Sequence, residues 1–338
     1  MSLLSFLNFA KEDKNIEITS QTGKKLIPWG DDNMFPQHLL KLYDTVPEHT
    51  SSIDFIIELT TNIGLNTDDF DYWTVKKFVS DFIIFGGIAI KNVKLNSGEF
   101  KPEYIDISKL RLTEENNKVG YCEKWGEWKT KVEWYDIISN EFNKTGIYIY
   151  KNIKSREKYP RPYYISSGKS IETLSKIIDY HNNNAENGFV PNLVINIPNV
   201  TDEKVQELYE RNFKKKFTGT SSQKFVLAFP ESNDTKITFE KLQNDNLDEK
   251  FKDLQIFLRD EIIIGHKLTS GSLIGVRQTN TGFSKQEYDE SLQIFKDVVI
   301  SGLQNELLYI FKMALKNENV IFNENVDENI KVDNNNNK

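Results

Sequence analysis

Adjacent carboxylates are the residues of this sequence best suited to hydrolytic chemistry. Examples are Asp31-Asp32, Asp68-Asp69 and Asp260-Glu261. A nuclease or a glycosidase needs two carboxylates held at a set separation around the bond that is cleaved. Here each pair falls in an expected turn or on the surface of an expected helix, in a chain with 28% charged residues. We therefore interpret these pairs as solvated surface and predict no catalysis from them.

The other residue types that carry catalysis lack the spacing that their chemistry requires. Histidine occurs at His38, His49, His181 and His266, with no HxxxH or HExxH pattern. The single Cys122 excludes an internal disulfide framework and a cysteine-based zinc site. No GxSxG, GxGxxG or GxxxxGK[ST] stretch is present. We predict no catalytic, metal or cofactor site, and we do not expect an enzyme.

The densest basic cluster comprises Arg211, Lys214, Lys215 and Lys216. Such a cluster could meet DNA phosphates or an acidic partner protein. It could equally be the polar end of a surface helix, where cations complement the helix dipole. The net charge of the whole chain is −7, whereas a tight sequence-specific DNA-binding protein is usually basic. Any contact with nucleic acid is therefore expected to be local or weak.

A polar loop interrupts two apolar helical patterns near the end of the chain. Its polar side chains are Arg277, Gln278, Thr279, Asn280 and Thr281. Enzymes use loops of this kind as lids, and ring-shaped channels use them to line a bore. One cation among short neutral side chains can touch a polyanion transiently without holding it, which suits transport of DNA.

The elements that must position these residues begin with helices and continue with strands. Helical patterns start at Met34, return over 50–63 and are expected again over 72–85, where Gly86-Gly87 closes the helix. From 88 to about 150, short alternating segments predict an antiparallel sheet. Those segments read IAIKNVKL, YIDI, EWKTKVEWYDI and GIYIYKNI. The fold class predicted here is α+β.

The second half of the chain predicts two rods that carry a cap. An extended link, KYPRPYYISS, leads into a helix that opens near Ser170. Residues 189–246 then read as strand, helix, strand and strand, and a helix follows over about 247–267. A capping box at Ser284 and Glu287 opens a last helix that runs to about 315. The tail from Lys316 is rich in Asn and acids and is expected to fray.

No transmembrane span is predicted, because the longest apolar run, 82–90, is far shorter than the ~18–20 residues needed. The start of the chain has a short apolar patch without a basic region or a cleavage site, so no signal peptide is expected. We expect a soluble protein of a reducing cytoplasm.

Three stretches share their order and spacing with one known family. They read PWGDDNMFPQHLLKLYDTVPEHTSSIDFIIELTTNIGL, YPRPYYIS and LRDEIIIGHKLTSGSLIGVRQTNTGFSKQEYDESLQIFKDVVISGLQNELLYIF. The first has a Gly-x-x-Asn-x-x-Pro segment before two helices. The last has a helix, a Gly-containing loop, Gly-Phe-Ser and a long helix. In this order they resemble the portal proteins of tailed bacteriophages.

The resemblance implies a portal-type fold with an antiparallel β and helical wing, two stem helices, a small α/β clip and a long C-terminal helix. The implied wing spans 1–168, with an arm at about 1–30, and continues at 269–315, where a tunnel loop lies at 272–283. Stem helix 1 is implied at 169–188, the clip at 189–246 and stem helix 2 at 247–268. Residues 316–338 would form a reduced crown or a disordered tail.

The resemblance also implies a ring, usually of twelve subunits, at one capsid vertex of a virion assembled in the host cytoplasm. Double-stranded DNA would pass through it, non-specifically and transiently, during packaging and ejection, with the polar side chains of the tunnel loop facing it. The terminase large subunit would dock at the clip through the basic cluster and supply the ATP-driven work. The major capsid protein and a head-tail adaptor are further implied partners, and no membrane is.

Two alternatives remain open on the sequence. One is a monomeric cytoplasmic enzyme in which the polar loop is a mobile lid over an acidic site. It would need convergent carboxylates or a phosphate-binding loop, and neither is found. The other is a different ring component of the head-tail connector, although such adaptors are generally smaller and lack paired stem helices.

Overall fold

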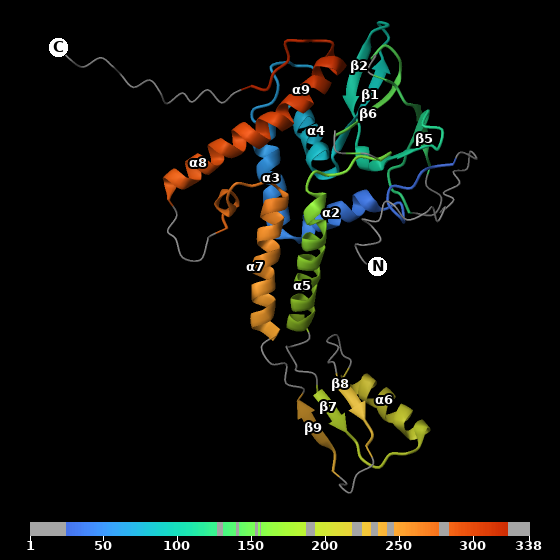
Figure 1. The fold of residues 1–338 in the computed structure, drawn as a ribbon. Coiled ribbons are helices and arrows are strands. Elements are labelled where there is room, and N and C mark those ends of the chain that lie inside the picture. Colours follow the sequence, from blue (N-terminus) through green and yellow to red (C-terminus); the bar gives the residue numbers. More distant parts are fainter. Residues whose placement is uncertain are drawn as a thin grey trace, which may run out of the picture. The chain divides into compact units, whose positions relative to one another are not determined.

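The computed structural model describes residues 25–126, 131–139, 142–152, 155, 157–186, 193–217, 225–230, 236–241, 247–276 and 284–323. The chain divides into two compact units (Figure 1). The larger unit comprises Met1–Glu172 and Asp260–Lys338, and the smaller unit comprises Thr173–Arg259.

Three helices open the described part of the larger unit. They are α2 (Phe35–Thr45), α3 (Pro47–Thr61) and α4 (Tyr72–Phe85). Proline stands in the first turn of α2 and of α3, where its missing N–H leaves no hydrogen bond unmade. The Asp71 side chain caps α4 by accepting from the Thr74 N–H at 2.7 Å. The predicted bounds of α4 are confirmed, whereas α3 begins earlier than the sequence pattern indicated.

Gly86 explains why α4 ends where it does. Its φ is +82°, which is left-handed, and a Cβ there would lie 2.0 Å from the Arg161 carbonyl oxygen. Only glycine satisfies both conditions without strain. The chain then enters the first strand directly.

Two three-stranded antiparallel sheets follow in the larger unit. The first has the order β2-β1-β6, with β1 at Gly87–Lys94, β2 at Phe100–Tyr104 and β6 at Gly146–Lys151. The second has the order β3-β4-β5, with β3 at Leu110–Leu112, β4 at Lys118–Tyr121 and β5 at Glu133–Asp136. The antiparallel sheet expected over this region is confirmed as two separate sheets.

The prediction of a strand over YIDI was wrong. Only Tyr104 of that segment belongs to a strand, and Ile107–Lys109 form a 3-10 turn, η1. The Asp106 carboxylate caps this turn by accepting from the Ser108 N–H at 2.9 Å. A local side-chain hydrogen bond therefore overrides the β propensity of the two isoleucines. The sequence patterns also missed β3 and β4, which are only three and four residues long.

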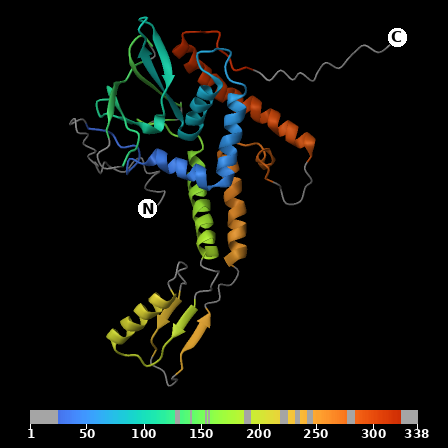
Figure 2. The same ribbon diagram turned by 180° about the vertical axis from the view of Figure 1, so that it is seen from behind.

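The last long helix is continuous but changes its hydrogen bonding midway. It consists of α8 (Lys285–Phe295), a π-helical turn η4 (Lys296–Ile300) and α9 (Ser301–Leu315). The Ser284 side chain accepts from the Glu287 N–H, as the capping box predicts. Figures 1 and 2 show that α8 and α9 run on as one rod.

By length and composition alone, the helix Lys285–Leu315 is long and apolar enough to cross a membrane. Runs of consecutive apolar residues did not single it out, because polar residues are interspersed along it. One side of it packs inside the larger unit. Phe295 stacks on Phe55 at 5.9 Å, and Phe311 lies 5.6 Å from Phe78.

Residues beyond α9 are packed rather than frayed over the described part of the tail. Val320 and Phe322 are buried, and Phe322 pairs with Leu65 in a β-bridge. The Asn66 N–H donates to the Ile321 carbonyl oxygen at 3.1 Å. Two buried apolar side chains and hydrogen bonds to residues 62–66 hold this short segment, although its composition predicted fraying. Residues 324–338 lie outside the described residues.

The smaller unit has a three-stranded sheet with the order β8-β7-β9. Its strands are β7 (Leu193–Asn196), β8 (Phe225–Ala228) and β9 (Thr238–Lys241), and α6 (Glu203–Phe217) connects the first two. β7 and β8 are parallel, so their connection must cross over through a helix, while β9 is antiparallel to β7. The predicted order of strand, helix, strand and strand is confirmed.

Two helices flank this sheet in the sequence and extend into the larger unit at one end. They are α5 (Gly168–Glu186) and α7 (Leu247–Gly265). Tyr180 of α5 lies 5.2 Å from Phe251 of α7, ring to ring. At the other end Gly265 lies so close to Ser167 that a Cβ would come within 2.1 Å of the Ser167 Oγ. These contacts pair the start of one helix with the end of the other, which confirms the antiparallel rods.

Candidate functional site

The polar loop was the leading functional feature of the sequence, and the structure describes the chain on both sides of it. Arg277, Gln278, Thr279, Asn280 and Thr281 themselves lie outside the described residues. Their assignment to a DNA-facing surface therefore stays a prediction. The segments that hold the loop at 266–276 and at 284–295 can be built from their contacts.

On the α7 side, the helix ends in a Schellman turn. The Leu268 N–H donates to the Ile263 carbonyl oxygen at 3.1 Å, and the Lys267 N–H donates to that of Ile264 at 2.9 Å. Lys267 takes the left-handed conformation, with φ of +58°, that glycine usually takes at this place. The direction in which the chain leaves α7 is therefore set by backbone hydrogen bonds.

The segment after this turn is a short 3-10 helix, η3 (Gly271–Ile274), capped by Ser270. It packs against α3 and α8. Thr269 Oγ1 donates to the Ser291 carbonyl oxygen at 2.8 Å, which ties the segment to α8. The Val276 N–H donates to the Gly271 carbonyl oxygen at 3.0 Å. The first part of the loop predicted at 272–283 is thus structured and anchored.

The outer face of α7 is a second feature that could be functional. Leu254, Phe257, Glu261 and Ile264 follow one another at spacings of three, four and three residues, so they lie on one side of the helix. Phe257 is 58% exposed and Ile264 is 69% exposed. Leu258 and Ile262 each directly follow a residue of this face, so they are turned from it by about 100° around the helix, and both are buried. α7 therefore has one apolar side packed within the chain and another that faces outward.

The outer face of α5 differs in charge from that of α7. Lys169, Thr173 and Lys176 are exposed at spacings of four and three residues. Asp253 and Asp260 flank the outer face of α7, which also contains Glu261. One helix thus presents cations and the other presents carboxylates beside exposed apolar side chains.

The N-terminal Gly-x-x-Asn-x-x-Pro segment forms part of the binding site of a buried arginine. Arg111 is fully buried, and its guanidinium donates to the carbonyl oxygens of Ser108, Leu110 and Asn33 at 2.7–2.8 Å. Its Nε–H donates to the Asn33 side-chain oxygen. Burial lowers the pKa of Arg111 to about 10, so it stays charged at neutral pH.

Two indole rings complete the binding site of Arg111. The Arg111 guanidinium carbon lies 5.6 Å from the Trp29 ring and 5.0 Å from the Trp125 ring. Asn33 reaches its place through a left-handed backbone, with φ of +65°, and its side chain also accepts from the Trp29 N–H at 3.1 Å. The motif that carried the family resemblance therefore serves the fold of the larger unit.

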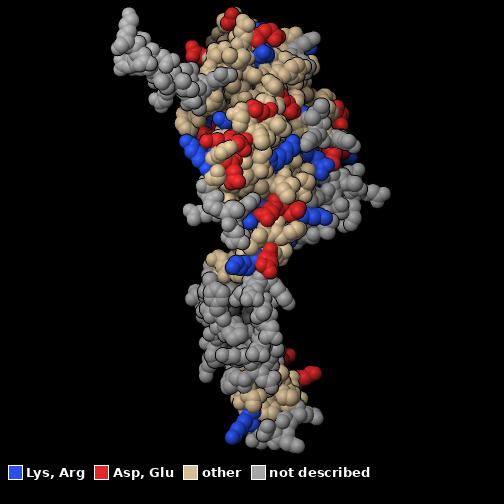
Figure 3. Space-filling model, turned by 60° about the vertical axis from the view of Figure 1, so that its left-hand side comes forward, with Lys and Arg blue, Asp and Glu red and all other residues tan. Residues whose placement is uncertain are grey.

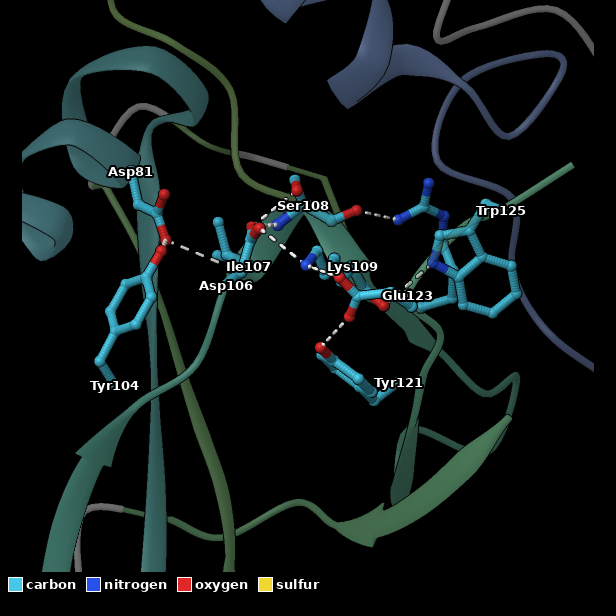
Figure 4. A network of polar contacts seen from close by, with 10 residues as sticks. Asp81, Tyr104, Asp106, Ile107, Ser108, Lys109, Tyr121, Glu123 and Trp125 are labelled. Carbon is cyan, nitrogen blue, oxygen red and sulfur yellow. Dashed lines mark hydrogen bonds and ion pairs between the residues drawn. The ribbon is translucent and has the colours of Figure 1, made fainter. Parts of the chain in front are cut away.

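A polar network joins α4 to the turn η1 (Figure 4). Asp81 is buried, and its carboxylate accepts from the Tyr104 hydroxyl at 3.1 Å and from the Ile107 N–H at 3.4 Å. Burial raises the pKa of Asp81 well above its usual range, and the charge of Asp106 raises it further. Sequence reasoning missed this group, although an acid inside the apolar run FVSDFIIF was a visible signal.

The basic cluster predicted at the clip lies on α6. Arg211 is exposed on this helix. Lys214, Lys215 and Lys216 fall in its last turn, and their side chains lie outside what the structure describes. On the face shown in Figure 3, acidic and basic side chains of the described residues alternate over short distances. Within the described residues, no group of three or more His, Cys, Asp or Glu side chains is placed to hold a metal ion.

Comparison with known proteins gives matches in structure and none in sequence. No family model matches this sequence, and no curated protein matches it. The described fold is similar to an HK97 family phage portal protein from Corynebacterium diphtheriae, with a TM-score of 0.53 and 8% identity, over 84% of this chain and 94% of that one. The chain has the fold of a phage portal protein.

The described fold is also similar to chains of gene transfer agent particles. A chain from the virion of a native gene transfer agent particle matches with a TM-score of 0.56 and 11% identity, over 90% of this chain and 86% of that one. A chain from the neck of that particle, computed with C12 symmetry, matches with a TM-score of 0.52 and 12% identity, over 85% of this chain and 83% of that one. The sequence resemblance to portal proteins is thus confirmed at the level of the fold.

Proposed function

We propose that this chain is a portal protein that forms a ring at one vertex of a virion capsid. Double-stranded DNA passes through the ring during packaging and ejection, and the chain has no catalytic activity of its own. The portal fold supports this proposal, since it matches chains of virion and neck particles. The observation that carries the ring is the pair of outward faces on α5 and α7.

The parts of the fold take roles in this proposal. Residues 1–168 and 269–315 form the wing, α5 and α7 are the stem helices, and residues 189–246 are the clip. Residues 316–338 take the place of a crown. The clip presents Arg211 and Lys214–Lys216 to the terminase large subunit or to a head-tail adaptor, and the wing meets the major capsid protein.

The exposed apolar face of α7 supports contact with another molecule. A helix in a protein that acts alone normally has a single apolar side, which packs inward. On α7 the exposed Phe257 and Ile264 are turned well away around the helix from the buried Leu258 and Ile262. The spacing of three and four residues is that of helix-to-helix packing. This face is therefore suited to receive a second helix.

The charges indicate which helix that is. Lys169 and Lys176 on the outer face of α5 complement Glu261 and the flanking Asp253 and Asp260 of α7. Each copy carries both faces, so α7 of one copy can pack on α5 of the next. A contact that joins one face of one copy to a different face of the next copy is head-to-tail. Such contacts close into a ring when the rotation from one copy to the next divides a full turn evenly. The C12 symmetry of the neck particle with the same fold supports twelve subunits.

Cross-linking of engineered cysteines tests this ring. The double variant Lys176→Cys, Phe257→Cys places one thiol on each face, and the single native Cys122 is buried. We expect mild oxidation to give a ladder of covalent oligomers, because every copy links to two different neighbours. A pair that yields only dimers, or only monomers, would contradict the head-to-tail ring.

A matched control uses the other side of α7. Lys252 is exposed but lies away from the apolar face. The double variant Lys176→Cys, Lys252→Cys should give no ladder under the same conditions. A ladder of equal strength from both pairs would show random collision rather than a defined interface.

The tunnel loop is the part proposed to touch DNA. Arg277 is its single cation, so few counterions are released when a duplex passes, and each contact is weak. Particles assembled from a chain that lacks residues 273–283 should fill with genome at least about tenfold more slowly. Filling at the normal rate, measured as DNA per particle over time, would remove the loop from the mechanism.

A further inference from the structure

A buried pair of histidines joins two segments of the larger unit that are far apart in the sequence. His49 lies on α3, and His266 directly follows α7. Their facing nitrogens, His49 Nδ1 and His266 Nε2, are 2.8 Å apart. Both side chains are fully buried, and Tyr164 packs on the two rings at 4.8 and 4.9 Å.

The geometry allows one proton between the two facing nitrogens. One ring donates its N–H and the other accepts, so the pair is bonded when both rings are neutral. The outer nitrogens, His49 Nε2 and His266 Nδ1, are buried and have no hydrogen-bond partner within the described residues. A first proton taken up on an outer nitrogen therefore forms an N–H that has no hydrogen-bond acceptor in the described part of the chain. A second proton would place an N–H on both facing nitrogens and break the bond between the rings.

The surroundings of the pair favour its neutral form. Burial lowers the pKa of His49 to about 3 and that of His266 well below its usual range, and the charge of His49 lowers the latter further. The titratable groups that face the pair are Tyr163 and Tyr164, from the segment before α5, and Lys267 beside His266, whose ammonium lies over the Tyr163 ring. Among the described residues, no carboxylate lowers the cost of charging either ring.

The pair sits where α7 passes into the base of the polar loop. His266 is the residue at which α7 gives way to its Schellman turn, and η3 packs on α3 only a few residues later. The close approach of Gly265 to Ser167 fixes the end of the helix itself. The histidine bond is thus a side-chain link between α3 and the segment 266–276.

We propose that the His49–His266 pair is a proton-operated latch that holds segment 266–276 against α3 near neutral pH and releases it in mild acid. The latch rests on contacts within the larger unit alone, so it does not depend on the ring or on DNA. When the segment opens, both rings reach water and can take up protons at the ordinary histidine pKa of about 6.5.

The direction of the pH effect follows from proton uptake. The open state binds more protons than the closed state below pH ~6.5, so acid favours opening. The open population is expected to rise up to about tenfold per pH unit for each histidine that titrates. Above pH ~7 it should no longer change with pH.

Amide hydrogen exchange of the whole protein tests the latch. The protection of residues 268–276, corrected for the intrinsic rate at each pH, should be constant from pH 8 to 7 and fall at least about tenfold between pH 6.5 and 5.5. The double variant His49→Asn, His266→Gln places amide groups near the two facing nitrogens and cannot titrate. It should show protection that is independent of pH.

Two further variants test whether the pH dependence comes from this histidine pair. The single variant His266→Gln leaves one titrating ring, so its pH dependence should be about half as steep on a logarithmic scale. His181→Gln removes a histidine outside the pair and should behave as the unchanged protein does. Protection that is independent of pH in the unchanged protein, or equally dependent on pH in the double variant, would overturn the proposal.

Discussion

Arg111 and the His49–His266 pair are both fully buried polar groups of the larger unit, yet their surroundings differ in one respect. Arg111 has four hydrogen bonds to oxygen acceptors and two indole rings around it. The histidines have one hydrogen bond between them, and their outer nitrogens have no partner in the described residues. The number of partners decides whether a buried polar group stays charged as a fixed part of the fold or stays neutral and can respond to pH.

The largest effect on stability is expected when the hydrogen-bonded guanidinium of Arg111 is removed. Arg111→Met leaves the carbonyl oxygens of Ser108 and Leu110 without these donors inside the core, so the free energy of unfolding should fall by about 3–5 kcal/mol. Urea unfolding followed by tryptophan fluorescence reports this directly, because Trp29 and Trp125 flank the site. The loss should be the same at pH 7.5 and 5.5.

An exposed cation on the neighbouring strand is the matched control for Arg111. Lys118 of β4 pairs with Asp136 at 2.6 Å at the surface. Lys118→Met should change the free energy of unfolding by less than about 1 kcal/mol. If Arg111→Met costs no more than this control does, the idea that hydrogen-bond partners fix Arg111 is wrong.

The histidine pair should give a smaller effect that appears only in acid. Because the folded pKa of both rings is depressed, their contribution to stability is complete above pH ~6.5 and is lost as pH falls. The unchanged protein should lose about 1.4 kcal/mol per pH unit for each histidine relative to His49→Asn, His266→Gln. Parallel stability curves for the two proteins between pH 7.5 and 5.5 would contradict this.

Asp81 is an intermediate case and should give the smallest change. It has two donors but no cation, and its folded pKa is raised. Its contribution to stability is therefore lost as pH rises through the folded pKa. Asp81→Asn keeps an acceptor without a charge and should raise the free energy of unfolding at pH 7 by about 1 kcal/mol, with no difference near pH 3.

Substitution of Asp71, at the start of the same helix, should change the free energy of unfolding in the opposite direction. The Thr74 N–H lowers the pKa of Asp71, so its carboxylate favours the folded state. Asp71→Asn should therefore weaken the protein at neutral pH, measured in the same urea titration as Asp81→Asn. Equal signs for the two aspartates would show that burial does not govern Asp81.

Local patterns predicted the elements of this fold well where one face of an element is apolar over its full length. The bounds of α4 follow from such a stripe and from Gly86, and the order of β7, α6, β8 and β9 follows from alternating segments. The failures have physical causes. YIDI became a turn because Asp106 caps it, and residues 320–322 are packed because Val320 and Phe322 are buried and Ile321 is hydrogen-bonded to Asn66.

The candidate site could be predicted only in part. The sequence around residues 277–281 predicts a polar loop between two helices, but it gave no sign that Thr269 and η3 anchor the segment before that loop. The outer face of α7 was not recognised, because a sequence shows which residues are apolar without showing which side is already covered. The histidine pair had no local signal, since 217 positions separate its members.

By itself, the amino-acid sequence determined the α+β class, the two antiparallel rods around a small inserted unit and the resemblance to portal proteins. These depend on hydrophobic period and order along the chain, which are local properties. Tertiary structure alone decided which polar groups are buried and how many partners each finds there. Hydrogen bonding and desolvation depend on what surrounds an atom in space, and Arg111, Asp81 and His266 acquire their surroundings only when distant segments pack together.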